Sequence, residues 1–444
     1  MASYRFELTD YHAVRKASIA LDGVTVLSGL NGSGKSTIAR WLQHTIYTLA
    51  HYDRLVEKEG IQTLEPQLFD LISMVSSLVG YQKSIAMRRS YDRIKSRRFE
   101  TLEQIEGDYR DICGTALNLI EDHLYESENK EDIERVANYF GVYLTKGTEA
   151  EVIDNLLHSL TTLLDARFAK VMETVVAKKE TRNDKNFSDK IFSIADETIE
   201  DDTIQIQLWE DGVELLNPNE FKIPLMLNRV IYINTQELGN PFIRRSEQGT
   251  YRGLLKMLSD TSESPVSEAS KSIAYLIKNL IGGDINVEKQ DLGGKIERTE
   301  FKFVAKNGKS FNLKGAATGV ISFSYILQLL QNGWLTDKTM LIIDEPESHL
   351  HPQWIVDYAR ILVLINKMIG TKILLSSHNP DMIAAIQTIS ESKGLKDITR
   401  FYLATPSPEA PDQNDFKDLG FNIEQIFDSF NIALSRIDSY NLPS

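Results

Sequence analysis

The chain has 444 residues, of which 42% are hydrophobic and 25% are charged, an ordinary composition for a globular protein of two or three domains. No run of about 18 apolar residues occurs and the N-terminal residues lack the apolar core of a signal peptide, so we expect a cytoplasmic protein without a membrane span. The single cysteine, Cys113, excludes an internal disulfide framework and a cysteine-based zinc site. The formal net charge of −14 argues against a uniformly basic nucleic-acid-binding surface but leaves room for a local basic patch.

The first fifty residues predict three short strands, a glycine-rich loop and a helix. The loop follows the strand Val24–Ser28 and has the pattern G-x-x-x-x-G-K-[ST], which is typical of phosphate-binding loops. Backbone N–H groups of such a loop face the phosphate oxygens, and the helix N-terminus adds a partial positive charge. The lysine of the pattern reaches the β- and γ-phosphates, and the next hydroxyl binds Mg²⁺. The predicted nucleotide-binding residues are therefore Gly29, Asn31, Gly32, Ser33, Gly34, Lys35, Ser36 and Thr37, with Lys35 on the phosphates and Ser36 on Mg²⁺.

Residues 51–199 have few glycines and show helical spacing of apolar residues, which predicts a large helical insert. Within it, Lys83–Arg98 carries seven basic residues and one acidic residue, with aromatic residues interleaved. This run is either a contact for nucleic-acid phosphates or an acidic partner, or a solvated helix face whose charges pair with the acidic stretch Glu121–Glu134. We favour the second interpretation. A polar return follows at 178–202.

Strands resume after residue 200, with predicted hairpins at 203–215 and at Asp284–Gln290 with Thr299–Ala305. Gly315–Val320 is a turn of small residues that opens an apolar helix. Later strands are predicted at Lys372–Ser376 and Thr399–Leu403. A linker rich in proline and acidic residues, at 405–415, and an amphipathic helix, at 421–437, complete the chain.

The apolar run Met340–Ile343 reads as a buried parallel strand that ends in two adjacent carboxylates, Asp344 and Glu345. Open α/β sheets bind their ligands at the carboxyl ends of strands, so these residues lie where chemistry is expected. His349 and His351 suggest a metal site, although a structural turn before Pro352 is the better interpretation.

Four features therefore occur in a set order: the phosphate loop at 29–37, the small-residue turn at 315–320, the carboxylate pair at 344–345 and His378. This order resembles the ABC-type ATPase superfamily in its non-transporter branch, which includes SMC-like, RecF-like and OLD-family proteins and the stand-alone ATPases of bacterial anti-phage systems. The resemblance covers residues 1–50 and about 200–405 and implies an α/β fold. It predicts a P-loop ATPase head of mixed sheet with flanking helices and an antiparallel β-subdomain, carrying the helical insert 51–199 and followed by a linker and helix at 406–444.

In that family ATP lies between two heads, so the resemblance implies an ATP-linked homodimer or higher assembly, with ATP and Mg²⁺ as its ligands. Asp344 acts in the metal shell, Glu345 polarises the attacking water as general base, and His378 contacts the γ-phosphate. Residues 348–350 cross the dimer interface. Thr318 and Gly319 cap the γ-phosphate of the partner's ATP, although the usual Ser-x-Gly core reads Ala317-Thr318-Gly319 here. Gln236, after the second core strand, is the candidate Mg²⁺-sensing glutamine, and a surface role for it is an equal alternative.

Three functions remain open at this point. The first is a slowly hydrolysing, dimerising ATPase switch that controls a separately encoded effector protein, with anti-phage defence inferred from family likeness alone. The second is a RecF- or SMC-like ATPase that binds DNA through Lys83–Arg98. The third is an ATP-locked scaffold, against which the presence of Glu345 argues.

Overall fold

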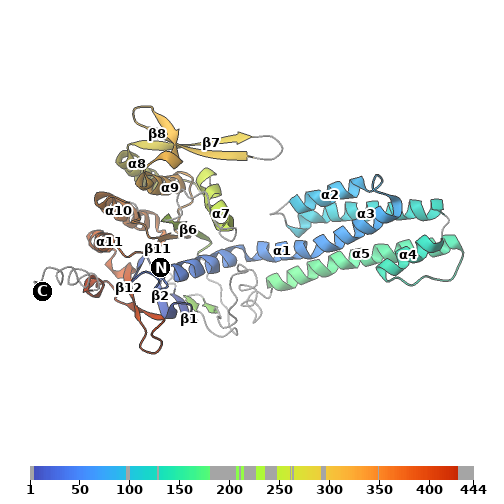
Figure 1. Ribbon diagram of the computed structural model, residues 1–444, viewed down its shortest axis with the longest axis horizontal. Coiled ribbons are helices and arrows are strands. Elements are labelled where there is room, and N and C mark those ends of the chain that lie inside the picture. The colour runs from blue at the N-terminus through green and yellow to red at the C-terminus, as the bar shows by residue number, and fades with distance from the viewer. Residues whose placement is uncertain are drawn as a thin grey trace, which may run out of the picture. The chain divides into compact units, whose positions relative to one another are not determined.

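The computed structural model describes residues 5–96, 101–127, 130–180, 207–209, 212–214, 227–235, 248–260, 262, 265–291, 297–348 and 350–428. The chain divides into two compact units, one made of Met1–Ala50 and Asn183–Ser444 and the other of His51–Arg182 (Figure 1). No helix within the described ranges combines the length and the apolar character that crossing a bilayer requires.

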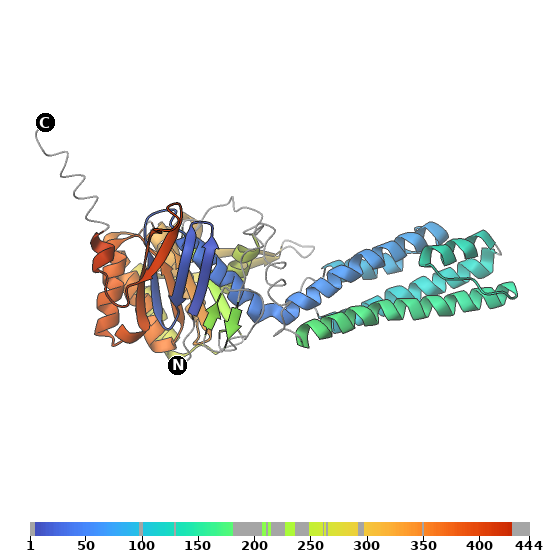
Figure 2. The ribbon, with the colours of Figure 1, turned by 90° about the horizontal axis from the view of Figure 1, so that it is seen from below.

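A ten-stranded mixed sheet organises the first unit, in the order β4-β5-β1-β2-β13-β12-β3-β11-β10-β6. Figure 2 shows the N-terminal strands of this sheet beside its C-terminal strands. The strands are β1 (Arg5–Tyr11), β2 (Val14–Ala20), β3 (Val24–Ser28), β4 (Gln207–Trp209), β5 (Gly212–Glu214), β6 (Arg229–Asn234), β10 (Thr339–Asp344), β11 (Lys372–Ser376), β12 (Thr399–Pro406) and β13 (Asn414–Asp418).

Five adjacent strands, β12, β3, β11, β10 and β6, run parallel. Their residues are apolar on both faces, because helices cover both sides of such a sheet. Val26, Ile231 and Ile343 belong to one large core, and neighbouring positions such as Leu27 and Ile342 are also buried. Since parallel strands end at the same edge, the loops after β3, β10 and β11 meet there.

The helices of the first unit place the later motifs around that edge. They are the start of α1 (Lys35–Val79), α7 (Gln248–Ser259), α8 (Glu268–Ile281), α9 (Thr318–Gln331), α10 (Pro352–Ile369) and α11 (Pro380–Ser392), with short 3₁₀ turns η2 (Leu313–Gly315) and η3 (Lys396–Ile398). Helices α8 to α11 contribute apolar residues to the same core as the parallel strands. His351 and Asn379 cap the N-termini of α10 and α11 with their side chains, which fixes where each helix begins after its strand.

A separate three-stranded antiparallel sheet consists of β7 (Gly283–Asp291), β8 (Glu297–Ala305) and β9 (Ser310–Asn312). The pairing of β7 with β8 confirms the predicted hairpin, and Asn307-Gly308 forms the turn into β9. The predicted fold class, a P-loop ATPase head with mixed sheet, flanking helices and an antiparallel β-subdomain, is thus observed.

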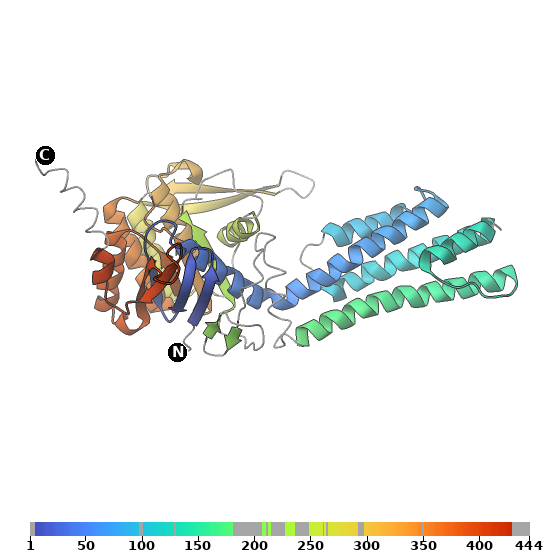
Figure 3. The same cartoon turned by 60° about the horizontal axis from the view of Figure 1, so that its bottom comes forward.

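The second unit is helical, as the apolar spacing of its sequence predicts (Figure 3). It contains the later part of α1 together with α2 (Ile85–Ser96), α3 (Leu102–Ser127), α4 (Lys130–Phe140) and α5 (Glu149–Glu180). Apolar residues three or four apart, such as Ile105, Tyr109 and Ile112 on α3, are buried between these helices.

The prediction of a linker at 405–415 is wrong, because strands occupy both ends of this range. Residues 399–406 form β12, the chain turns, and 414–418 form β13, which pairs antiparallel with β12 and parallel with β2. The sequence signal for this strand was weak because only Phe416 of β13 is buried. Pro406 and residues 414–418 therefore belong to the main sheet, and 407–413 form the turn between its two strands. Of the helix predicted at 421–437, residues 424–428 are helical, residues 421–423 are not, and residues 429–437 lie outside the described residues.

Candidate functional site

The phosphate loop connects β3 to α1 at the carboxyl edge of the parallel strands. Gly34 has a φ of +96°, and a Cβ there would lie 2.5 Å from the Val14 side chain. Only glycine allows this backbone conformation together with so close an approach of β2. The loop is therefore wedged against the neighbouring strand, which holds its shape.

Lys35 is the first residue of α1, and its ammonium lies back over the loop that precedes it. Its Nζ donates hydrogen bonds to the carbonyl oxygens of Gly29, at 2.9 Å, and Leu30, at 2.8 Å. An ammonium has three donors, so a third can serve a ligand oxygen. Burial lowers the pKa of Lys35, and the carboxylates of the loop 344–347 oppose that shift. The lysine thus lies within the electrostatic field of the carboxylate strand, which joins two motifs 310 residues apart.

Asp344 is the last residue of β10 and is 5% exposed. The phenol of Tyr232 on β6 donates a hydrogen bond to its Oδ2 at 3.2 Å. Burial raises the pKa of Tyr232, and the carboxylate of Asp344 raises it further. The other carboxylate oxygen, Oδ1, is buried and has no hydrogen-bond partner among the residues that the structure describes. A buried carboxylate oxygen is costly to leave unmatched, so this atom is suited to a cation.

Glu345 follows directly and turns the chain sharply. Its φ is +52°, a left-handed conformation that is unusual for a residue with a side chain. The hydroxyl of Thr235 contacts the carbonyl oxygens of both Asp344 and Glu345, and the Glu345 N–H bonds to Ser376 on β11. Two neighbouring strands therefore hold the strained turn in place. Strained backbone of this kind is concentrated at functional sites.

His378 follows β11 and meets the carboxylate strand. Its Nδ1 lies 3.5 Å from Oε1 of Glu345 and 3.6 Å from Oε1 of Glu347. The His378 side chain is 43% exposed, so part of the ring remains accessible while Nδ1 is buried. The predicted base and the predicted switch histidine are thus brought into contact distance within one chain.

The residues present fit a Mg²⁺–nucleotide ligand. The loop supplies curled backbone with positive φ at Gly29, Gly32 and Gly34, and two buried polar atoms, Ser33 Oγ and Asp344 Oδ1, have no hydrogen-bond partner. Among the residues that the structure describes, no group of three or more His, Cys, Asp or Glu side chains could hold a metal ion alone. A nucleotide-bound Mg²⁺ does not need such a group, because phosphates and water supply most of its ligands. Asn31, Ser36 and Thr37 lie in the same loop and first helical turn, with Ser36 exposed.

Thr318 and Gly319 form the first turn of α9. This helix carries none of Lys35, Asp344, Glu345 and His378, which we call the constellation around Lys35. The carbonyl of Thr318 accepts from Ser322, which is an ordinary intrahelical contact. A Cβ at Gly319 would lie 2.8 Å from the ring of Trp354 on α10. Close packing of α9 on α10 therefore explains this glycine within one chain, and the contact with a partner's ATP remains a prediction.

Some predicted residues lie outside the described residues: Gln236, His349, Arg97 and Arg98. His351 is described, and its Nδ1 accepts from the Gln353 N–H as the cap of α10. This cap supports the structural interpretation of that histidine over the metal-site interpretation.

The basic run is partly neutralised within the second unit. Lys83 lies 3.5 Å from Glu126, and Arg93 bonds to Asp108 at 3.0 Å. Arg88 lies over the ring of Tyr81. One pair thus involves the predicted acidic stretch and the other an acidic residue outside it. Arg89 and Lys95 are exposed on the same helix, α2.

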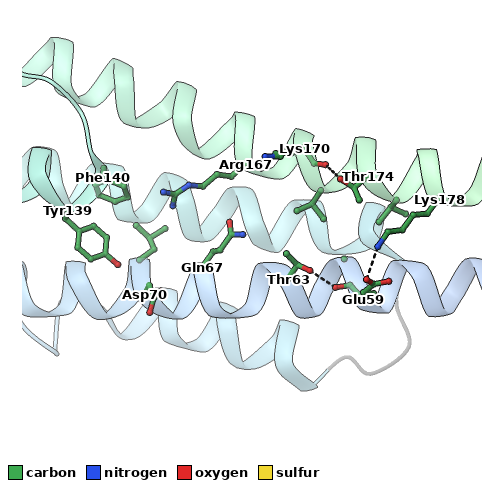
Figure 4. A pocket seen from close by; sticks show the side chains of 14 residues that line it. Glu59, Thr63, Gln67, Asp70, Tyr139, Phe140, Arg167, Lys170, Thr174 and Lys178 are labelled. Carbon is green, nitrogen blue, oxygen red and sulfur yellow. Dashed lines mark hydrogen bonds and ion pairs between the residues drawn. The ribbon is translucent and has the colours of Figure 1, made fainter. Parts of the chain in front are cut away.

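A groove of about 730 Å³ lies in the second unit, between α1 and α5 with the end of α4 (Figure 4). An ion pair between Lys178 and Glu59, at 2.8 Å, crosses it, and Phe140 and Tyr139 line its other end. None of its lining residues belongs to the constellation around Lys35.

Three residues of the site were not predicted: Tyr232, Thr235 and Glu347. Tyr232 lies in the apolar strand β6, and Thr235 directly follows it. In such a strand the sequence predicts a tyrosine to be a core residue and a threonine to be an ordinary strand residue. Only the pairing of β6 with β10 brings them to Asp344. Glu347 had a usable signal, since it is a carboxylate three residues after Asp344 in a turn.

A family described as "AAA domain, putative AbiEii toxin, Type IV TA system" matches residues 88–384, more than half of the chain, in a range that begins after the phosphate loop. No curated protein sequence matches.

Among solved structures, the chain is similar to the Smc head domain with an extended coiled coil bound to the C-terminal domain of ScpA from Pyrococcus furiosus. The identity is 10%, with 99% of this chain and 100% of that chain covered and a TM-score of 0.34. It is also similar to an SmcHead bound to the C-winged helix domain of ScpA, with 9% identity, coverage of 96% and 100% and a TM-score of 0.36. The SMC head domain from Thermotoga maritima shows 12% identity, coverage of 42% and 53% and a TM-score of 0.24. On the family match, the chain belongs to the AAA-domain family of the putative AbiEii toxin type.

Proposed function

We propose that this chain binds ATP and hydrolyses it to ADP and phosphate, as a dimerising switch that controls a separately encoded effector. The observation that carries the proposal is the meeting of Lys35, Glu345 and His378, with Asp344, at the carboxyl ends of three adjacent parallel strands. A phosphate-binding lysine near a buried aspartate and a partly exposed glutamate is an arrangement suited to phosphoryl transfer to water.

Each residue has a role that its position supports. Lys35 and the loop N–H groups bind the phosphates, while Ser36 and Asp344 hold Mg²⁺, which would neutralise charge on the phosphates. Glu345 accepts a proton from water as the water oxygen attacks the γ-phosphorus and the bond to the ADP oxygen breaks. His378 lies beside Glu345 with part of its ring accessible, where it can contact the terminal phosphate.

The switch is the finer part of the proposal. Two copies would close on ATP, with Thr318 at the N-terminus of α9 facing the nucleotide of the partner, as the resemblance to ABC-type ATPases implies. The family description names a putative toxin of a TA system, which supports a chain that works as one component of a larger system. Anti-phage defence is the context that we propose for it.

The test combines turnover and mass. Wild-type protein should hydrolyse ATP slowly, and Lys35→Ala should lower turnover by roughly 100-fold or more. Lys338→Ala, at an exposed lysine before β10, is the control and should match wild type. Glu345→Gln should bind ATP without turnover and double in mass in solution with Mg-ATP. Equal turnover in wild type and Lys35→Ala would contradict the ATPase proposal, whereas an unchanged mass would contradict only the dimer.

A second candidate, a DNA-associated ATPase, is favoured by the exposed Arg89 and Lys95 on α2. Binding of duplex DNA that weakens with salt and is lost in Arg89→Glu/Lys95→Glu would support it. Binding that is unaffected by this double variant would remove α2 from any such role.

A further inference from the structure

Glu347 is a buried acidic residue two positions after the candidate base, with 5% of its side chain accessible. Two tight turns, from the Ser348 N–H to the Glu345 carbonyl and from the Leu350 N–H to the Glu347 carbonyl, reverse the chain after β10. This reversal leaves the Glu347 side chain buried against the loop that follows β11 rather than in solvent.

A single oxygen, Oε1 of Glu347, accepts two hydrogen bonds from the loop that follows β11. It accepts hydrogen bonds from Ser377 Oγ, at 2.9 Å, and from the His378 backbone N–H, at 3.0 Å. The Nδ1 atom of His378 lies 3.6 Å from the same oxygen. Two hydrogen bonds to one buried carboxylate oxygen, from a side chain and from the next backbone N–H, restrict the position of the dipeptide Ser377-His378.

The loop held in this way is connected to the phosphate loop as well. The Ser377 N–H donates to the carbonyl of Leu27 on β3, two residues before Gly29. On its other side, the Asn379 N–H donates to Ser377 Oγ, and Asn379 caps α11. Glu347 therefore lies at the junction of the three loops that form the candidate site.

We propose that Glu347 is a positioning residue that holds His378 facing Glu345 by accepting the hydrogen bonds of Ser377 and the His378 backbone. The proposal rests on the proposed ATPase function and adds a residue to it. The Glu347 carboxylate touches no reacting atom in this account; it acts through His378. What matters is the acceptor at Oε1, so a glutamine, which keeps a carbonyl oxygen of the same reach, should serve nearly as well.

The first experiment measures kcat and KM for ATP in Glu347→Gln, Glu347→Ala, His378→Ala and the double variant Glu347→Ala/His378→Ala. Glu347→Gln should stay within about threefold of wild type, whereas Glu347→Ala should lower kcat roughly tenfold or more with little change in KM, because misplaced catalytic groups cost rate rather than binding. In the His378→Ala background, Glu347→Ala should have almost no further effect. Additive losses, or a Glu347→Gln as inactive as Glu347→Ala, would overturn the proposal.

If Glu347→Ala does not fold, Ser377→Ala takes its place in the same cycle. It removes one of the two hydrogen bonds to Oε1, so a smaller loss of kcat, about threefold, should disappear in the His378→Ala background. A loss that persists there would overturn the proposal equally.

A second measurement does not depend on hydrolysis. The imidazole NMR signal of His378, identified by its absence in His378→Gln, should shift in nucleotide-free Glu347→Ala and stay near its wild-type position in Glu347→Gln. An unmoved signal in Glu347→Ala overturns the positioning role even if the protein hydrolyses ATP. If the His378 signal shifts in Glu347→Ala but wild-type protein does not hydrolyse ATP, the positioning role of Glu347 stands and only the ATPase function is rejected.

Discussion

The phenol of Tyr232 on β6 donates a hydrogen bond to Oδ2 of Asp344 on the neighbouring strand β10, over 3.2 Å. The second oxygen of this carboxylate, Oδ1, is buried and accepts no hydrogen bond from the residues that the structure describes. One oxygen is therefore held by Tyr232, and the other has no such bond within the described part of the chain, as the proposed Mg²⁺ site requires. This asymmetry orients the carboxylate in the way that residues behind a metal ligand usually do.

Tyr232→Phe should therefore weaken the use of Mg²⁺. We expect the Mg²⁺ concentration for half-maximal ATP hydrolysis to rise about tenfold, because a ligand that loses its supporting hydrogen bond is less well oriented. The measurement is turnover against Mg²⁺ at saturating ATP. Tyr358→Phe is the matched control, since the Tyr358 hydroxyl is buried without a hydrogen-bond partner and its loss should leave the Mg²⁺ dependence unchanged. Identical curves for wild type and Tyr232→Phe would remove Asp344 from the metal shell or Tyr232 from its support.

Gly34→Ala and Gly32→Ala should separate backbone strain from steric exclusion in the phosphate loop. Both glycines have positive φ, +96° and +80°, so each alanine costs about 1 kcal/mol or more in backbone conformation. Only the Gly34 variant adds a contact, 2.5 Å from Val14, while nothing lies within 4 Å of a Cβ at Gly32. We expect the free energy of unfolding to fall further, and ATP affinity to be lost more completely, in Gly34→Ala. Equal effects in chemical denaturation and nucleotide titration would contradict the wedge against β2.

Glu345 stores backbone strain at φ +52°. Replacement by glycine removes that strain, whereas alanine keeps it, so Glu345→Gly should be more stable than Glu345→Ala by about 1 kcal/mol. Neither variant should hydrolyse ATP. The same pair of substitutions at exposed Lys338 is the control, and there glycine should be no more stable than alanine. Chemical denaturation of the four variants gives the comparison, and a glycine at 345 that is less stable than alanine would contradict strain at this position.

Glu347 should make stability depend on pH. Burial raises the pKa of Glu347 above 4.5, and the hydrogen bonds from Ser377 and His378 oppose that shift. The folded state therefore keeps the proton to higher pH than the unfolded state, and the free energy of unfolding falls as the pH rises from 4.5 through the folded pKa. The side chain of His378 lies 3.6 Å from this carboxyl, and Lys35 interacts with it electrostatically.

Glu347→Gln removes the titrating carboxyl and with it this pH dependence. The free energy of unfolding of Glu347→Gln, relative to that of wild type, should therefore increase as the pH rises from 4.5 through the folded-state pKa of Glu347. Denaturant titrations at a series of pH values measure it, with Glu391→Gln at the surface as the comparison. A difference between Glu347→Gln and wild type that stays constant with pH, or that changes in parallel for Glu391→Gln, would contradict a local origin.

Local patterns predicted the strands, loop and helix that carry much of the candidate site. The G-x-x-x-x-G-K-[ST] pattern between a strand and a helix predicts the loop around Lys35, and an apolar run before Asp344 predicts β10. These predictions succeed because strand, turn and helix signals are carried by residues adjacent in the sequence. The β13 strand was missed for the same reason, since its single buried residue, Phe416, gives no periodicity.

Residues adjacent in the chain predict the separate elements: a phosphate loop, a helical unit, a carboxylate strand and a histidine that follows a strand. The contacts between these elements are seen only in the folded chain. Tyr232 donates a hydrogen bond to Asp344, and the Thr235 hydroxyl holds the turn at Glu345. Glu347 accepts a hydrogen bond from the backbone N–H of His378. The physical reason is that these contacts depend on which strands are neighbours in the sheet. The order β3, β11, β10, β6 is set by packing of the whole core, and no short stretch of residues encodes it.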